Sequence, residues 1–206
     1  MAVGDRQRLI TEIVAGVLGE PARSGLTFPW FKNKHTEADF GRHYLLISTI
    51  FQALKGDLQA NRNKATRPLK CDVYFGGNHN CMFEFDEFQH FSTPRLQALQ
   101  LYPSDLCTTF DIGQYTRDCK AHREEADRYR SNKRTRDFDF KGGRTAQRAY
   151  FDCFRDLLPE IHGLNPTLRI AECEVQSVYV DDVESRSVVR DLIEQKLSRV
   201  GSVRAS

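Results

Sequence analysis

Residues 81–90 read CMFEFDEFQH, and this stretch decides the fold class. Phe83 and Phe85 alternate with Glu84 and Asp86, and side chains along a strand alternate between its two faces. The pattern therefore predicts a strand with one apolar face and one acidic face. Carboxylates held this close repel one another, and a divalent cation such as Mg²⁺, which prefers oxygen ligands, relieves that repulsion. The stretch therefore indicates half of a metal site.

A second strand-like run lies just upstream. Residues 70–75 read KCDVYF, and residues 76–80 read GGNHN, a composition typical of turns. Antiparallel pairing of the two runs places Val73 opposite Phe83, so that the apolar residues share one face. This register is favoured because a slip of one residue would mix the two faces. The polar residues that would share the other face are Asp72, Glu84 and Asp86, with Lys70 beside them.

An aspartate on one strand followed by Glu-x-Asp on the next resembles the PD-(D/E)xK nuclease superfamily. Residues 83–90 resemble the Glu-apolar-Asp-Gly-x-x-His signature of its very-short-patch repair endonuclease-like branch, and residues 168–170 resemble a later core strand of that branch. The resemblance implies cleavage of phosphodiester bonds with Mg²⁺, or Mn²⁺ in its place. The catalytic residues that it implies are Asp72, Glu84, Asp86, Gln89 and His90, with Asp72, Glu84 and Asp86 as metal ligands.

The chain departs from the family pattern in several places. Glu87 stands where the branch has glycine, no proline precedes Asp72, and the interval between the hairpin motifs and the last strand is long. A second alignment reads Glu87 and Gln89 as the Glu-x-Gln variant found in some restriction enzymes. In a regular strand these two side chains face away from Glu84 and Asp86, so both sets can serve only if a bulge intervenes. We favour Glu84 and Asp86, because Phe83 then points into the core.

Patterns outside the hairpin are mostly helical. Apolar residues recur at helical spacing over 5–18, over a segment from Thr36 to Gly56, and over 145–158. We expect an α/β fold with a restriction endonuclease-like core, in which helices flank a mixed sheet with a central antiparallel hairpin. The expected parts of a single domain over 1–206 are an N-terminal helical portion (1–60), a nuclease-like core (66–180), and a C-terminal helix and tail (181–206).

Basic residues concentrate between Arg117 and Arg148. This segment holds eleven Lys or Arg and six Asp or Glu, a local net charge of +5, whereas the whole chain carries +2. Gly142, Gly143 and Arg144 precede a predicted helix, where a guanidinium and backbone N–H groups suit a phosphate. The residues that we predict to bind nucleic acid are Lys70, Lys133, Arg134, Arg136, Lys141, Arg144, Gln147 and Arg148.

Composition excludes several classes of protein. The chain has 206 residues, of which 40% are hydrophobic, and this suits a folded domain. No apolar run approaches the roughly 20 residues that cross a bilayer, so we expect no membrane partner and, by default, a cytoplasmic location. The six cysteines form no Cys-x-x-Cys pair, which disfavours a zinc ribbon.

Three functions compete at this point. The first is a Mg²⁺-dependent endonuclease acting on DNA, with RNA as a second choice of substrate; a homodimer is expected by resemblance only. The second is a nuclease-like module that binds nucleic acid without cutting it. The third is an interaction protein whose charged surface meets a protein partner. Separately from these functions, the acidic hairpin can also be interpreted as simply the solvated face of a half-buried sheet.

Overall fold

The computed structural model describes residues 4–205, and it contains a mixed sheet in the order β1-β2-β3-β4. The strands are β1 (Arg23–Ser24), β2 (Val73–Phe75), β3 (Cys81–Asp86) and β4 (Asn165–Ala171). The pairs β1–β2 and β2–β3 are antiparallel, whereas β4 runs parallel to β3. The α/β class and the central antiparallel hairpin are therefore confirmed.

The hairpin also has the predicted register. Val73 pairs with Phe83, and Phe75 pairs with Cys81 at the turn. Gly77 has a φ of +55°, a backbone conformation that suits glycine, and it allows the tight reversal between the strands.

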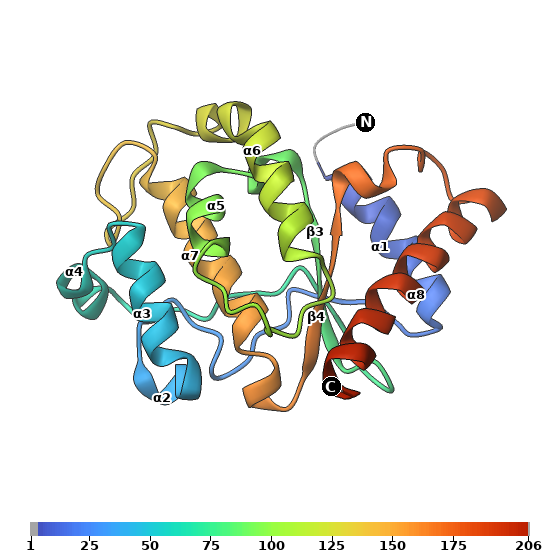
Figure 1. Cartoon of the computed structure of the whole chain (residues 1–206), viewed down its shortest axis with the longest axis horizontal. Helices are drawn as coiled ribbons and strands as arrows, with labels where there is room; N and C mark the ends of the chain where they lie inside the picture. The colour runs from blue at the N-terminus through green and yellow to red at the C-terminus, as the bar shows by residue number, and fades with distance from the viewer. Residues whose placement is uncertain (1–3, 206) are drawn as a thin grey trace.

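Helices cover both faces of the sheet, as Figure 1 shows. The helices are α1 (Asp5–Leu18), α2 (Glu37–Phe40), α3 (Tyr44–Ala53), α4 (Leu58–Asn63), α5 (Thr93–Leu99), α6 (Ile112–Arg128), α7 (Gly143–Leu157) and α8 (Val183–Ala205). α1 and α8 lie on one side of β3 and β4, and α5, α6 and α7 lie on the other side, with α3 and α4 outside them. None of the helices within residues 4–205 is both long and apolar enough to span a membrane.

The apolar face of the hairpin packs against α1 and α8. Phe83 and Phe85 of β3 join Ile10 of α1 and Val189 of α8 in one buried cluster. Burying a Phe or Ile side chain contributes roughly 2 kcal/mol, so the pairing of apolar residues across the hairpin fixes which face meets these two helices.

The opposite face meets α7, which is buried on several sides. Tyr150 and Phe154 of α7 contact Phe51 of α3 and Phe40 of α2 in the larger core cluster. α7 therefore lies between the sheet and the outer helices, and any polar side chain that it turns toward the sheet is shielded from water.

The structure corrects two boundaries. The helix expected from Thr36 to Gly56 is interrupted, because Gly41 has a φ of +48°, which ends α2 and leads into a short 3-10 turn before α3. The strand expected through residue 90 ends at Asp86, and Phe88–His90 form another 3-10 turn. The strand β1, which pairs with β2, was not expected from the sequence.

Candidate active site

The acidic face of the hairpin is buried. Glu84 is 2% exposed and Asp86 is 1% exposed, because α7 covers them. Three charged residues of one helical face, Asp152, Arg155 and Asp156, point from α7 toward this side of the sheet and take part in its ion pairs. The interpretation of Glu84 and Asp86 as part of a solvated sheet face is therefore wrong, whereas Asp72 is half-buried.

Asp72 and Glu84 form the first part of the cluster. The backbone N–H of Asp72 donates to Glu84 Oε1 over 3.3 Å, which places the two carboxyl-bearing residues side by side. Arg155 Nε lies 2.8 Å from Glu84 Oε1, and Arg155 Nη2 donates to the carbonyl of Lys70 over 3.2 Å. Arg155 therefore pairs with the carboxylate of Glu84 and contacts the backbone two residues before Asp72.

Burial changes the protonation of this pair. It raises the pKa of Glu84 to about 7, although Arg155 acts in the opposite direction. Burial also raises the pKa of Asp72, and the charges of Arg155 and His90 oppose that rise. Burial therefore favours the neutral forms of both carboxyl groups, and it outweighs the opposing charge of Arg155.

Asp86 forms the second part, and its oxygens are already paired. Arg169 Nη1 donates to Oδ1 over 2.7 Å and to Oδ2 over 2.8 Å, and the Tyr115 hydroxyl donates to Oδ2 over 3.1 Å. Arg169 Nε also donates to Asp156 over 2.7 Å, and Arg95 pairs with the same carboxylate over 2.8 Å. Asp86 is thus held inside a network of buried charges.

His90 lies beside this network in the 3-10 turn. Its Nδ1 is 3.3 Å from Asp152 Oδ2 and 3.4 Å from Asp86 Oδ1. Burial alone would lower the pKa of His90, but the carboxylates of Asp152 and Asp86 outweigh burial, and the pKa is raised. Burial would likewise raise the pKa of Asp152, yet His90 and Arg169 hold that pKa well below its usual value.

Glu87 and Gln89 lie off the strand, so the alternating-face argument does not apply to them. Gln89 Nε2 donates to the carboxylate of Glu87. Gln89 Oε1 is buried without a hydrogen-bond partner among residues 4–205, and the Gln89 carbonyl accepts from Arg148 over 3.1 Å. The predicted residue Arg148 is therefore tied to the turn that carries His90.

The residues at the acidic cluster fit a magnesium ion only in part. Asp72 and Glu84 offer the hard carboxylate oxygens that Mg²⁺ prefers, and one or two carboxylates with substrate phosphates are a usual set. The oxygens of Asp86 are occupied by Arg169 and Tyr115. Within residues 4–205, no group of three or more His, Cys, Asp or Glu side chains is arranged to hold a metal.

The predicted nucleic-acid residues occupy two places. Lys70 and Arg148 adjoin the acidic cluster, through the Arg155 and Gln89 contacts described above. Lys133, Arg134 and Arg136 are exposed in the segment between α6 and α7, where Arg134 pairs with Asp139, and this segment lies apart from Asp72, Glu84 and Asp86. This segment, residues 129–142, is called the basic loop below.

Two predicted residues hold the basic loop in place. Arg144 Nη1 donates to Gln147 Oε1 over 2.8 Å, and Gln147 Nε2 donates to Asp137 Oδ1 over 3.0 Å. Asp137 also accepts from Asn61 over 3.0 Å and pairs with Lys64. Gln147 therefore fixes the base of the loop to α7.

Sequence reasoning missed several members of the cluster. Asp152 and Asp156 lie among apolar residues in the sequence of α7, and Arg95 lies in α5. The spacing of Asp152, Arg155 and Asp156 places all three on one helical face, and charged residues within a mostly apolar helix were the available signal.

A comparison of the chain with protein-family models, with curated proteins and with solved structures found no match. No family is therefore assigned, and the nuclease resemblance rests on the residues of the hairpin and of β4.

Proposed function

We propose that this protein is a Mg²⁺-dependent endonuclease that acts on DNA, with Asp72 and Glu84 as the metal ligands. One observation carries the proposal: Asp72 and Glu84 lie side by side beside Arg155, and burial raises the pKa of both carboxyl groups. A cation bound between them would stabilise both ionised forms, and Mg²⁺ prefers oxygen ligands.

The arrangement of elements supports the same proposal. The resemblance implies a helix lying across the sheet near the acids, between the hairpin and a later core strand. α7 has this place, since it precedes β4 and pairs with the acidic face of β3 through Arg155.

Asp72 and Glu84 would hold the ion, which would supply an activated water and positive charge at the cleaved phosphate. Arg155, which pairs with Glu84, would then have to give up that contact. Asp86 is a positioning residue rather than a ligand, because it holds Arg169 and the His90 ring. Asp152 fixes Nδ1 of His90, so that Nε2 donates a proton to the leaving oxygen.

Binding would use the positive residues on both sides of the cluster. Lys70 and Arg148 lie beside the acids and would contact phosphates near the cut. The exposed residues Lys133, Arg134 and Arg136 of the basic loop would contact the backbone farther away, which gives an affinity that falls steeply with salt.

The test is cleavage of plasmid, genomic and single-stranded DNA in Mg²⁺, Mn²⁺ or EDTA. We expect metal-dependent cleavage that is lost in Asp72→Asn and in Glu84→Gln. Asp191→Asn is the matched control, because Asp191 is an exposed acid on α8, on the far side of the sheet. Unchanged cleavage by Asp72→Asn would contradict the proposed site.

A second candidate is a nuclease-like module that binds nucleic acid without cutting it. The observation that favours it is the internal pairing of the acids, Glu84 with Arg155 and Asp86 with Arg169. In that case the protein binds DNA in a salt-sensitive way, cuts nothing in any metal, and binds equally well after Asp72→Asn.

A further inference from the structure

Three arginines near the acidic cluster have no carboxylate partner. Arg130 belongs to the basic loop, and Arg144 and Arg148 lie four positions apart on one face of α7. Among residues 4–205, no Asp or Glu side chain forms an ion pair with any of the three. These three residues are called the arginine cluster below. Their positive charge is therefore not balanced within the described part of the chain.

The ring of Tyr129 brings two members of the arginine cluster together. The guanidinium carbon of Arg130 lies 5.1 Å from the ring centroid, and that of Arg148 lies 5.6 Å from it. Both distances suit a cation–π contact. Tyr129 is 39% exposed and Arg130 is exposed, whereas Arg144 and Arg148 are half-buried. The arginine cluster is thus ordered by protein contacts and still reached from solvent.

Most donors of the arginine cluster have no acceptor in the described chain. A guanidinium carries five N–H groups. Arg144 uses one of them on Gln147 Oε1, over 2.8 Å, and Arg148 uses one on the Gln89 carbonyl, over 3.1 Å. The Arg130 side chain donates to no group within residues 4–205. The remaining N–H groups are available to an anion.

The placement of these charges is unfavourable for the fold by itself. Arg144 and Arg148 are like charges at positions i and i+4, and Arg144 lies in the first turn of α7, where the helix dipole disfavours positive charge. Burial, together with the charges of Arg148 and Arg130, lowers the pKa of Arg144. Arg130 has a φ of +53°, in the left-handed region that favours glycine. A bound anion would relieve the repulsion among the three charges.

The number of charges and donors favours one kind of anion. A phosphomonoester has three terminal oxygens and a charge of about −1.5 to −2 at pH 7. A phosphodiester within a strand carries a single negative charge and has two such oxygens. Guanidinium groups bind phosphate oxygens through paired N–H groups, so three of them suit a phosphomonoester better than a phosphodiester.

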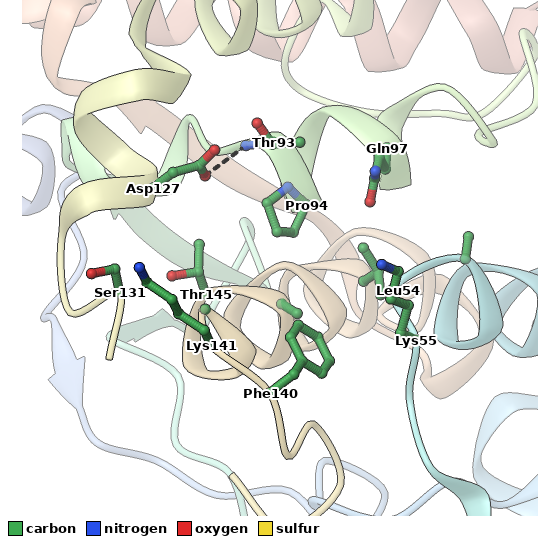
Figure 2. Close-up of a pocket in the computed structure, with 13 residues that line it drawn as sticks. Leu54, Lys55, Thr93, Pro94, Gln97, Asp127, Ser131, Phe140, Lys141 and Thr145 are labelled. Carbon is green, nitrogen blue, oxygen red and sulfur yellow. Dashed lines mark hydrogen bonds between the residues drawn. The ribbon is translucent and has the colours of Figure 1, made fainter. Parts of the chain in front are cut away.

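The lysines at the start of α7 are not gathered in this way. Figure 2 shows a cavity of about 350 Å³ in which Lys141 and Lys55 lie at opposite ends, with Phe140 between them. Arg144 does not line this cavity. The arginine cluster is therefore a separate and denser concentration of positive charge.

The arginine cluster adjoins the acidic cluster. Arg148 and Arg155 are seven positions apart on α7, which is about 10 Å along the helix axis. Arg148 also contacts Gln89, the residue before His90. A phosphate held by the arginine cluster would thus lie near the carboxyl groups but would not touch them.

We propose that the arginine cluster binds a phosphomonoester group. This group has two sources, the phosphorylated end of a nucleic-acid strand and a free phosphate monoester such as a mononucleotide. The assignment to a strand end rests on the proposed function, and it would make the terminal phosphate a part of the substrate. Binding of the group itself requires neither metal nor cleavage.

The first arm of the test measures binding of the full chain to oligonucleotides of one sequence by fluorescence anisotropy. They carry a 5′-phosphate, a 3′-phosphate or only hydroxyl ends, and EDTA removes metal. We expect one phosphorylated end to bind at least about tenfold tighter than hydroxyl ends, because it adds charge-assisted hydrogen bonds. The second arm titrates the protein calorimetrically with a deoxynucleoside monophosphate and with its nucleoside. Binding of the monophosphate alone, without a preference in the first arm, identifies the free monoester as the source.

Variants then locate the site. Arg144→Gln should reduce the preference for phosphate at least about fivefold without lowering the melting temperature, because it removes one of two like charges at i and i+4. Arg130→Gly should do the same, because glycine suits the left-handed backbone at this position. Arg190→Gln is the matched control, since Arg190 is an exposed arginine of α8 on the far side of the sheet.

The proposal is overturned if phosphorylated and hydroxyl-ended oligonucleotides bind equally and the monophosphate does not bind. It is also overturned if Arg144→Gln and Arg130→Gly keep the full preference, or if they weaken binding of all oligonucleotides by the same factor. Failure of the proposed function is a different result, because a protein that cuts no DNA in any metal can still show the preference in EDTA.

Discussion

One nitrogen of Arg169 donates to both carboxylate oxygens of Asp86, over 2.7 and 2.8 Å, and so links the parallel strands β3 and β4 across their buried face. Arg169 is fully buried and Asp86 is 1% exposed. Buried charges are stable only when paired, so this contact is a condition for packing α7 on the sheet.

Replacement of Arg169 by Met should therefore destabilise the fold. It leaves Asp86 and Asp156 buried without their main partner, and we expect a loss of about 3 to 5 kcal/mol in the free energy of unfolding. Urea denaturation measures it. The control is Arg199→Met, which breaks the exposed pair with Asp111 and should cost less than about 1 kcal/mol. Similar costs for both variants would contradict the role of Arg169.

Stability should fall as the pH rises from 5 to 8. The pKa of Glu84 is raised from 4.5 to about 7 in the folded state, so between these values the folded chain holds a proton that the unfolded chain has lost. Ionisation of Glu84 then costs about 3 kcal/mol of folding free energy. The raised pKa of His90 acts in the same direction, because its stabilising charge is lost as the pH rises.

Denaturation at several pH values tests this expectation. Glu84→Gln has no group to ionise at that position, so its stability should fall less steeply between pH 5 and 8 than that of the wild type. Equal slopes for the two proteins, or a wild type that gains stability over this range, would show that Glu84 does not titrate near neutrality.

Gly143 is required by a close backbone approach. A Cβ at this position would lie 1.8 Å from the carbonyl oxygen of Phe138, so Gly143→Ala must displace the basic loop from the start of α7. We expect a loss of about 2 kcal/mol or more, measured by thermal denaturation. A Cβ at Gly201 of α8 would have open space within 4 Å, so Gly201→Ala should stabilise the helix by up to about 1 kcal/mol. If Gly143→Ala left the melting temperature unchanged, the basic loop would not be packed against the start of α7.

The basic loop should control the salt dependence of nucleic-acid binding. Each phosphate contact contributes a slope of about −0.9 to the plot of log affinity against log salt. Removing Lys133, Arg134 and Arg136 together should therefore flatten the slope by roughly 0.9 for each residue that contacts a phosphate. Binding of a DNA duplex at several salt concentrations gives the slope. Arg190→Ala, an exposed arginine on α8, serves as the control, and an unchanged slope in the triple variant would remove the loop from the interface.

The hairpin could be predicted from the sequence because its signals are local. Residues 70–86 contain both the alternation of apolar and polar residues and the turn residues, and this alternation also excludes a register slip. Val73 pairs with Phe83 as expected. The helix over 5–18 was predicted for the same reason. The interruption at Gly41 was missed, because the apolar spacing continues across it and only the backbone angle reveals the break.

The environment of the acids could not be predicted, because it depends on contacts between distant segments. Arg169 lies 83 residues from Asp86 along the chain, and the sequence around either residue contains no signal that predicts their pairing. Alternation in β3 separated the acidic face from the apolar face correctly, but a solvated acidic face and one covered by α7 give the same local pattern. The environment of the acids depends on where α7 packs. The role of the charged residues on α7 could therefore be recognised only once the position of this helix was known.

The long connection between β3 and β4 also imposes an order on synthesis. A ribosome adds about 5 to 20 residues each second, so the 83 residues that separate Asp86 from Arg169 take roughly 4 to 17 seconds. During that interval the nascent chain contains the hairpin and its acids but not Arg169, the partner of Asp86, whereas Arg155 of α7, the partner of Glu84, is made before β4. We therefore expect the sheet to close late, with α7 already available to cover its acidic face.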